Sequence, residues 1–205
     1  MGGRFITFEG VDGSGKTTQL RRLAATLRAA GEAVVETREP GGATGAEAIR
    51  RLLVEGEPGR WSPETEILLF TAARRDHVER TIAPARARGE TVLCDRFADS
   101  TRVYQGVARA GLRGMVDRLH ELSIGIEPDL TLILDIDPEA ALSRGLARGT
   151  AEDRFERFGL DFQQKLRAGF LALAAEFPGR CRVIRAEGSA EEVAARIAAA
   201  VMETP

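Results

Sequence analysis

Short apolar runs alternate with longer amphipathic stretches along the chain. Five runs have the length and composition of buried strands: residues 4–9, 33–37, 91–95, 130–135 and 181–185. Strands without a polar face are typical of a parallel sheet that is covered by helices on both sides. The alternation therefore predicts an α/β protein made of βαβ units around a mainly parallel sheet.

Four stretches carry the spacing of amphipathic helices, with apolar residues recurring on one face. They are residues 16–30, 63–88, 155–177 and a final helix near the C-terminus. Ser62 followed by Pro63 is a typical start for the second of them, since serine caps a helix and proline fits its first turn. Ser189 and Glu192 have the spacing of a capping box and predict the start of the last helix.

Composition narrows the class of protein. The 205 residues, with a net charge of −2, suit one α/β domain spanning 1–205 and argue against binding nucleic acid through bulk charge. No apolar run approaches the roughly 20 residues that span a bilayer, and no signal pattern opens the chain. Cys94 and Cys181, the only cysteines, fall in strand-like runs, which predicts two buried free thiols. We therefore expect a cytoplasmic protein that binds neither nucleic acid nor a membrane.

A phosphate-binding motif follows the first predicted strand. Residues 10–17 read Gly-Val-Asp-Gly-Ser-Gly-Lys-Thr, which matches G-x-x-x-x-G-K-[ST], and Lys16 is one of only two lysines in the chain. Glycines let backbone N–H groups turn onto phosphate oxygens, Lys16 would neutralise the β- and γ-phosphates, and the Thr17 hydroxyl would reach Mg²⁺. The expected ATP-binding residues are Gly10, Val11, Asp12, Gly13, Ser14, Gly15, Lys16, Thr17 and Thr18.

Three further features favour a small-molecule phosphotransferase over a GTPase, whose Asn-Lys-x-Asp element cannot exist in a chain without asparagine. Asp95 and Arg96 follow one another at the end of a predicted strand, where a carboxylate can reach the metal and an arginine can bind a phosphate. The alternative is that they form a solvent-exposed charge pair. The stretch 144–154 carries Arg144, Arg148 and Arg154, as in a mobile lid that closes on a phosphoryl group; the alternative is an exposed basic helix end. Phe70 and Arg74 lie four residues apart and could bind a nucleobase, although phenylalanine at helical spacing is more often part of a core.

Together these motifs resemble the thymidylate kinase family over nearly the whole chain. The matching segments occur in order: FEGVDGSGKTTQ (8–19), TREPGG (37–42), EAIRRLL (47–53), LLFTAARR (68–75), DRFADSTRVYQG (95–106) and PDLTLILDIDPE (128–139). The resemblance implies a P-loop NTPase fold with a five-stranded parallel sheet, helices on both faces and a mobile lid at about 144–154. It also implies transfer of phosphate from ATP–Mg²⁺ to dTMP by a homodimer.

The resemblance assigns roles to individual residues. Arg38 and Arg96 would hold the dTMP phosphate, Asp12 would lie near the sugar and metal, and Asp95 would join Thr17 in the metal shell. The base pocket would comprise Arg50, Phe70 stacked on thymine, Arg74 on an exocyclic oxygen, and Ser100, Thr101 and Gln105 as polar contacts, with Tyr104 disfavouring a ribose 2′-hydroxyl.

Family members differ in whether the catalytic arginine lies in the P-loop or in the lid. Residue 13 is glycine here, so the resemblance assigns this role to the lid, and which of its arginines reaches the phosphoryl group stays open. The expected catalytic set is Lys16, Arg96, Asp12, Arg144, Arg148 and Arg154. The resemblance also predicts a cis Glu39–Pro40 bond.

Two other functions stay open from the sequence. One is a kinase for a different nucleoside monophosphate, which would differ in its base pocket. The other is a P-loop ATPase that acts as a regulatory or assembly module, which would hydrolyse ATP without an acceptor. The paired Phe70 and Arg74 and the arginine-rich lid favour the kinase.

Overall fold

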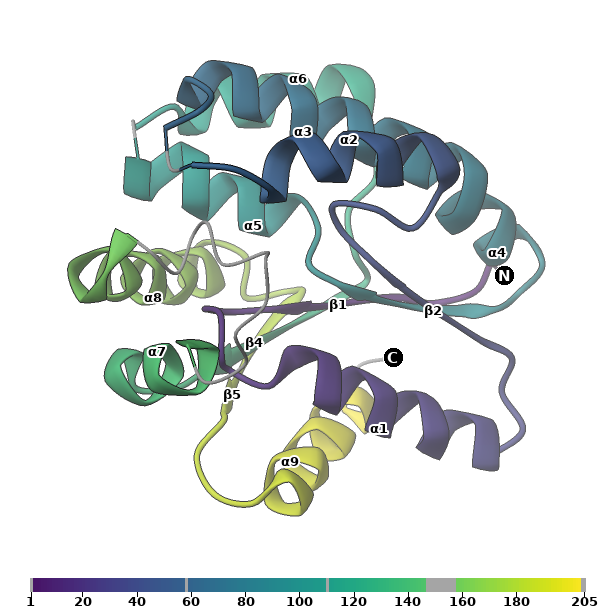
Figure 1. The fold of residues 1–205 in the computed structure, drawn as a ribbon. Coiled ribbons are helices and arrows are strands. Elements are labelled where there is room, and N and C mark those ends of the chain that lie inside the picture. The colour runs from purple at the N-terminus through teal and green to yellow at the C-terminus, as the bar shows by residue number, and fades with distance from the viewer. Residues whose placement is uncertain (1, 58, 110, 147–157, 204–205) are drawn as a thin grey trace.

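Five parallel strands form a single sheet at the centre of the fold (Figure 1). The structure, a computed structural model, describes residues 2–57, 59–109, 111–146 and 158–203, without the side chains of 108, 109 and 144–146. The strands are β1 (Phe5–Glu9), β2 (Val34–Arg38), β3 (Thr91–Asp95), β4 (Leu130–Asp135) and β5 (Cys181–Arg185), in the order β2-β3-β1-β4-β5. They match the five predicted strands to within one residue, and the predicted fold class is confirmed.

The central strand β1 pairs with β3 on one side and with β4 on the other. Phe8 lies beside Asp95, and Glu9 lies beside Ile133, so neighbouring strands end at nearly the same level. In a parallel sheet the carboxyl ends of all strands face the same crevice. The sheet therefore brings the last residues of β1, β2 and β3 to one edge.

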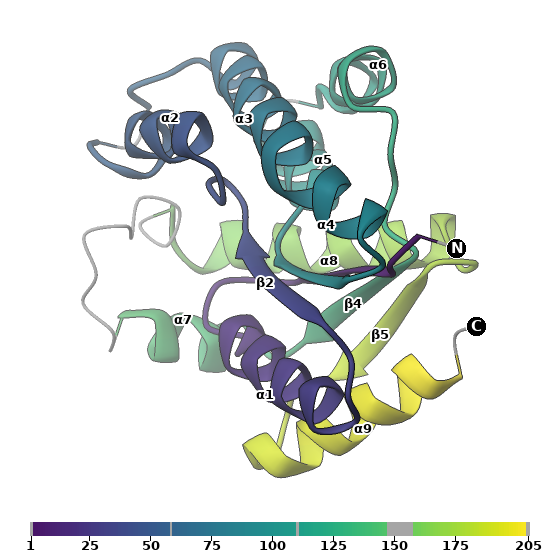
Figure 2. The same cartoon turned by 90° about the vertical axis from the view of Figure 1, so that its right-hand side faces the viewer.

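Helices cover both faces of the sheet, and two views agree on which helix covers which face (Figures 1 and 2). On one face lie α1 (Lys16–Ala29) and α9 (Ala190–Met202). The other face carries α2 (Thr44–Val54), α3 (Pro63–His77), α4 (Ala83–Ala87), α5 (Ala98–Val103) and α6 (Arg113–Ser123). Two further helices, α7 (Pro138–Leu146) and α8 (Leu160–Glu176), pack against each other, and α8 also contacts β4, β5 and α5. Within the described residues, no helix is both long and apolar enough to cross a membrane.

The predicted helix 63–88 is not one regular helix. It consists of α3, a π-helical segment η1 (Val78–Ile82) and the short α4. Pro84 explains the interruption, because proline lacks an N–H group and its ring clashes with the carbonyl four residues earlier. A wider turn ahead of the proline relieves that clash. A second π-helical segment, η2 (Tyr104–Arg109), extends α5.

The core fills the space between the sheet and its helices. On one face of the sheet, the rings of Phe5 and Phe97 meet edge to face with 5.0 Å between their centroids. A larger apolar cluster contains buried residues of α1, α8 and α9. Cys94 and Cys181 are buried and free, as predicted. Ser189 and Glu192 form the predicted capping box at the start of α9.

Candidate active site

The P-loop connects the end of β1 to the start of α1. The first helical residue is Lys16, and the N-cap, Gly15, has no side chain to bind the first-turn N–H groups. Those groups and the positive end of the helix dipole are therefore available to an anion. The loop thus has the geometry that the sequence motif predicts.

Gly13 lies against α7 and has a left-handed backbone, with φ of +84°. A Cβ atom there would lie 2.0 Å from the carbonyl oxygen of Ala141, far inside van der Waals contact. Any side chain, including arginine, would push α7 away from the loop. This contact explains in physical terms why residue 13 is glycine.

Lys16 is almost fully buried and its ammonium group faces the loop. Nζ donates to the carbonyl oxygens of Val11 at 2.8 Å and Gly10 at 3.2 Å, and it lies 3.9 Å from Asp12 Oδ1. Burial and the nearby Arg96 lower the pKa of Lys16 to about 8, against the opposing pull of nearby carboxylates. A phosphate anion beside Nζ would favour the charged form.

Arg96 is the centre of a group of polar contacts next to the P-loop. Its Nη2 donates to Asp12 Oδ1 at 2.5 Å and to Tyr104 Oη at 3.1 Å, and its Nη1 donates to Gly10 O and Ser100 Oγ. Tyr104 in turn donates to Asp12 Oδ2 at 3.0 Å. Burial alone would raise the pKa of Asp12, but the charges of Arg96 and Lys16 outweigh it and hold that pKa well below its usual range. Asp12 is therefore an ionised carboxylate between two cations.

Glu9 anchors the turn that carries Arg96. Its side chain is fully buried and accepts hydrogen bonds from Phe97 N at 2.8 Å, Ser100 N at 3.2 Å and Ser100 Oγ at 2.5 Å. Burial, with a smaller contribution from Asp99, raises the pKa of Glu9 to about 7. Sequence reasoning missed this residue, although its position directly before the P-loop was a signal.

Thr17 and Asp95 meet where the metal was predicted. The Thr17 hydroxyl donates to Asp95 Oδ2 at 2.5 Å. A hydroxyl and a carboxylate are hard oxygen ligands, which suit Mg²⁺. Across the described part of the chain, no cluster of three or more His, Cys, Asp or Glu side chains could hold a metal alone. The pair therefore fits an ion that takes its remaining ligands from nucleotide phosphates and water.

One cavity of about 730 Å³ joins these groups to the helical side of the molecule. Its volume is in the range of small-molecule sites. Of the predicted site residues, it is lined by Asp12, Gly13, Gly15, Lys16, Thr17, Thr18, Arg38, Arg50, Phe70, Arg74, Asp95, Arg96, Ser100, Thr101, Tyr104 and Gln105. Three P-loop residues do not line it: Gly10, Val11 and Ser14. The predicted lid falls largely outside the described residues, which include neither Arg148 nor Arg154, nor the side chain of Arg144.

Residues of α3, α5 and η2 form a further part of the cavity lining. Phe70 is half-buried and borders the cavity. Arg74 is buried, with Nε on Glu39 Oε2 at 2.7 Å and Nη2 on Thr101 Oγ1 at 2.9 Å. Gln105 Nε2 donates to Glu66 Oε2 at 3.0 Å. The other amide atom of Gln105, the buried Oε1, has no hydrogen-bond partner in the described part of the chain. The lining here thus combines an aromatic ring with polar groups that hydrogen bonds hold in place.

Two predicted arginines lie near the end of β2. Arg38 is exposed and pairs with Glu47 at 3.2 Å, while Arg50 donates to Pro40 O at 2.6 Å. The Glu39–Pro40 bond is cis, as predicted. Both arginines line the cavity from the β2 side.

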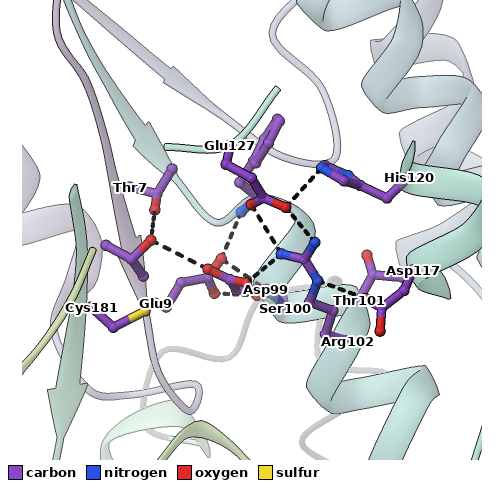
Figure 3. A network of polar contacts seen from close by, with 12 residues as sticks. Thr7, Glu9, Asp99, Ser100, Thr101, Arg102, Asp117, His120, Glu127 and Cys181 are labelled. Atoms are coloured by element: carbon purple, nitrogen blue, oxygen red, sulfur yellow. Dashed lines mark hydrogen bonds and ion pairs between the residues drawn. The ribbon is translucent and has the colours of Figure 1, made fainter. Parts of the chain in front are cut away.

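A second polar network lies directly behind Ser100 (Figure 3). Asp99, which is buried, binds Arg102 at 2.8 Å and Arg180 at 2.6 Å. Glu127 pairs with Arg102 and lies 3.1 Å from His120. These partners are separated by 3 to 81 residues in sequence, so no local motif revealed the network.

Comparisons with known proteins identify one family along nearly the whole chain. The family model for thymidylate kinase matches residues 8–197. The chain is 67% identical to a thymidylate kinase of Jannaschia sp. (strain CCS1), an alignment that covers 93% of this chain and 91% of that protein. It is 54% identical to a thymidylate kinase of Caulobacter vibrioides, with 98% and 97% covered.

Structural similarity extends over the same length. A crystal structure of thymidylate kinase from Ehrlichia chaffeensis superposes with a TM-score of 0.80 at 35% identity, covering 98% of this chain and 99% of that one. With a family match over nearly the whole chain and relatives above 50% identity, the chain belongs to the thymidylate kinase family.

Proposed function

We propose that this chain phosphorylates dTMP to dTDP with ATP, and that residues 1–205 act as one kinase domain in the cytoplasm. The observation that carries the proposal is one continuous cavity that is lined both by the P-loop and by the Phe70–Arg74–Gln105 group. Two nucleotides could enter it with their phosphates facing each other. In-line transfer requires this arrangement.

The donor would bind at the P-loop. The uncapped start of α1 would hold the ATP phosphates, and Lys16 would neutralise charge on the transferring group. Thr17 and Asp95 would hold Mg²⁺, which supplies charge neutralisation between the β- and γ-phosphates when it is bound. Arg144, Arg148 and Arg154 stay candidates for the arginine that reaches the phosphoryl group.

The acceptor would bind between α3, α5 and the end of β2. Arg96, which Asp12 and Ser100 hold in place, would bind the dTMP phosphate together with Arg38. The substrate phosphate is already ionised at neutral pH, so the reaction needs positioning more than a general base. Phe70 would stack on the base and Arg74 would donate to a base oxygen.

Tyr104 would distinguish deoxyribose from ribose. Its hydroxyl is already bound to Asp12 and Arg96, and its ring packs near Phe162 and Phe170. The side chain therefore cannot move away easily from a 2′-hydroxyl. A rigid wall of this kind selects by exclusion.

We also propose that the chain forms a homodimer through α2, α3 and α6. Helix α3 packs against both α2 and α6, and each of the three carries an exposed leucine: Leu52 at 39%, Leu68 at 52% and Leu122 at 84% exposure. An apolar patch that runs across adjacent helices favours a protein interface. Light scattering on the purified chain would measure its mass, and a monomer at micromolar concentration would contradict the proposal.

The test of the activity is ADP formation from ATP–Mg²⁺ with each nucleoside monophosphate in turn, beside a control without acceptor. Stimulation by dTMP above all other acceptors supports the proposal. Stimulation by a different monophosphate would identify another nucleotide kinase. Turnover that no acceptor changes would indicate a P-loop ATPase.

A further inference from the structure

A chain of buried hydrogen bonds connects the end of β2 to Arg74 on α3. Thr37 Oγ1 lies 2.7 Å from His77 Nε2, and His77 Nδ1 lies 3.1 Å from Glu39 Oε1. The other oxygen of Glu39 accepts from Arg74 Nε at 2.7 Å. Glu39, Arg74 and His77 are 5%, 2% and 0% exposed. None of the catalytic steps above uses the imidazole, although it is completely enclosed.

We infer that His77 is a positioning residue for base recognition, which acts through Glu39 to fix the guanidinium of Arg74 at the acceptor end of the cavity. The inference rests on the proposed function, because it assigns Arg74 to a base oxygen. It goes further by naming what holds Arg74 in the orientation that this contact requires.

Among the described residues, the guanidinium of Arg74 makes hydrogen bonds to protein groups through only two of its three nitrogens. Nε is bound to Glu39 and Nη2 to Thr101, whereas Nη1 has no hydrogen bond within the described residues. Arg74 also borders the cavity, and its guanidinium lies 5.2 Å over the ring of Phe97. Nη1 is thus a donor of fixed position, suited to a carbonyl oxygen of a ligand.

His77 keeps this arrangement by occupying Glu39 Oε1. Without that donor, Oε1 would be a buried carboxylate oxygen with no partner. The carboxylate could then take both Nε and Nη2 of Arg74 in the bidentate geometry that arginine favours. That change would pull Nη2 away from Thr101 and reorient Nη1.

The contacts also specify which nitrogen of His77 must carry a proton. A carboxylate only accepts hydrogen bonds, so Nδ1 donates to Glu39, while Nε2 contacts the Thr37 hydroxyl. Gly42 encloses the site, since a Cβ there would lie 2.3 Å from Thr37 Oγ1 and 2.4 Å from His77 Nε2. The imidazole is therefore held with Nδ1–H toward Glu39.

The chain contains a matched control in His120. It is also buried, at 6% exposure, lies on a helix and is 3.1 Å from a glutamate oxygen, that of Glu127 (Figure 3). Glu127, however, pairs with Arg102 and Arg180, neither of which lines the cavity. His120 touches the acceptor site only through an edge-on contact with the ring of Phe97. Its loss therefore measures the cost of removing a buried histidine whose glutamate partner does not hold Arg74.

The kinetic test compares His77→Leu, His77→Asn and His120→Leu in the full chain. We expect His77→Leu to raise the KM for dTMP about tenfold or more, with the KM for ATP changed by less than about twofold. The Asn amide nitrogen can replace Nδ1 as a donor to Glu39, so His77→Asn should restore the dTMP KM to within about threefold of the unmodified chain. His120→Leu should leave the ratio of the two KM values unchanged.

Equal effects of His77→Leu and His120→Leu on both KM values would overturn the inference. ¹⁵N NMR of the unmodified chain gives a second test that needs no variant to fold. It should show His77 with a proton on Nδ1, and an Nδ1 without a proton would overturn the inference. If the unmodified chain has no dTMP-dependent turnover, the proposed function fails instead, and the tautomer measurement still decides the pairing.

Discussion

Lys16 and Arg96 place two cations in a buried region around one carboxylate, Asp12. Burial lowers the pKa of Lys16 to about 8, so the charged form already carries a cost in the free chain. A bound phosphate would offset that cost. Lys16 and Arg96 are thus placed so that a bound anion stabilises their charged forms.

Removing the Lys16 charge tests this arrangement. We expect Lys16→Ala to lower kcat/KM at least about 100-fold, on the order of 3 kcal/mol of transition-state stabilisation, as for loss of other groups that stabilise developing charge. Circular dichroism should show an intact fold. Turnover close to that of the unmodified chain would contradict the role of Lys16.

Phe70 tests the acceptor end. Because its ring borders the cavity and is only half-buried, Phe70→Ala should raise the KM for dTMP far more than the KM for ATP. Its stability loss should be smaller than the roughly 3–5 kcal/mol typical of a fully buried phenylalanine. Glu64→Ala, on an exposed residue of the same helix that belongs to neither the cavity nor the proposed dimer interface, serves as the control. Equal changes in both KM values with a lowered Tm would indicate a core role for Phe70.

Glu9 predicts a pH dependence of stability. Its pKa is raised from 4.5 to about 7, so the folded chain binds more protons than the unfolded chain between these values, and stability falls as pH rises through this window. At about 1.4 kcal/mol per pKa unit, the contribution is on the order of 3 kcal/mol.

The measurement is urea unfolding of the unmodified chain and Glu9→Gln at pH 5 and pH 8. Glutamine does not titrate, so the stability of Glu9→Gln relative to the unmodified chain should increase from pH 5 to pH 8. Other groups titrate in both proteins and cancel in the difference. A difference that is the same at both pH values would contradict the raised pKa of Glu9.

Among the helices and strands, local sequence patterns predicted the five strands and the start of the last helix. The strands were predictable because each is a short apolar run between polar turns, and Ser189 with Glu192 marked the start of α9. Pro84 lies inside the predicted helix 63–88. Hydrophobic periodicity did not predict that this segment divides into α3, the π-helical η1 and α4. The short helices α5 and α7 have too few turns for a clear period.

The capping box at α9 allows a direct stability test. The Ser189 hydroxyl accepts from Glu192 N at 3.2 Å, and the Glu192 carboxylate accepts from Ser189 N at 2.7 Å. Ser189→Ala should therefore destabilise the fold by about 1 kcal/mol. Urea unfolding measures the change, and activity at a temperature well below Tm should stay the same. An unchanged midpoint would show that the cap contributes nothing.

At the scale of the molecule, the site depends on contacts between distant segments. The P-loop was predictable because its chemistry lies in eight consecutive residues. The partners of Arg74, by contrast, are Glu39 and Thr101, which lie 35 and 27 residues away. Only the folded chain reveals that His77 and Glu39 meet, or that α7 leaves no room for a side chain at residue 13.

In the proposed reaction, one cavity brings ATP and dTMP together for direct phosphoryl transfer. ³¹P NMR of the unmodified chain with ATP, Mg²⁺ and dTMP tests it most directly, because every phosphorus product is identified. We expect dTDP and ADP in a one-to-one ratio, with no inorganic phosphate formed alongside them. ADP accompanied by inorganic phosphate, with dTMP unchanged, would contradict it.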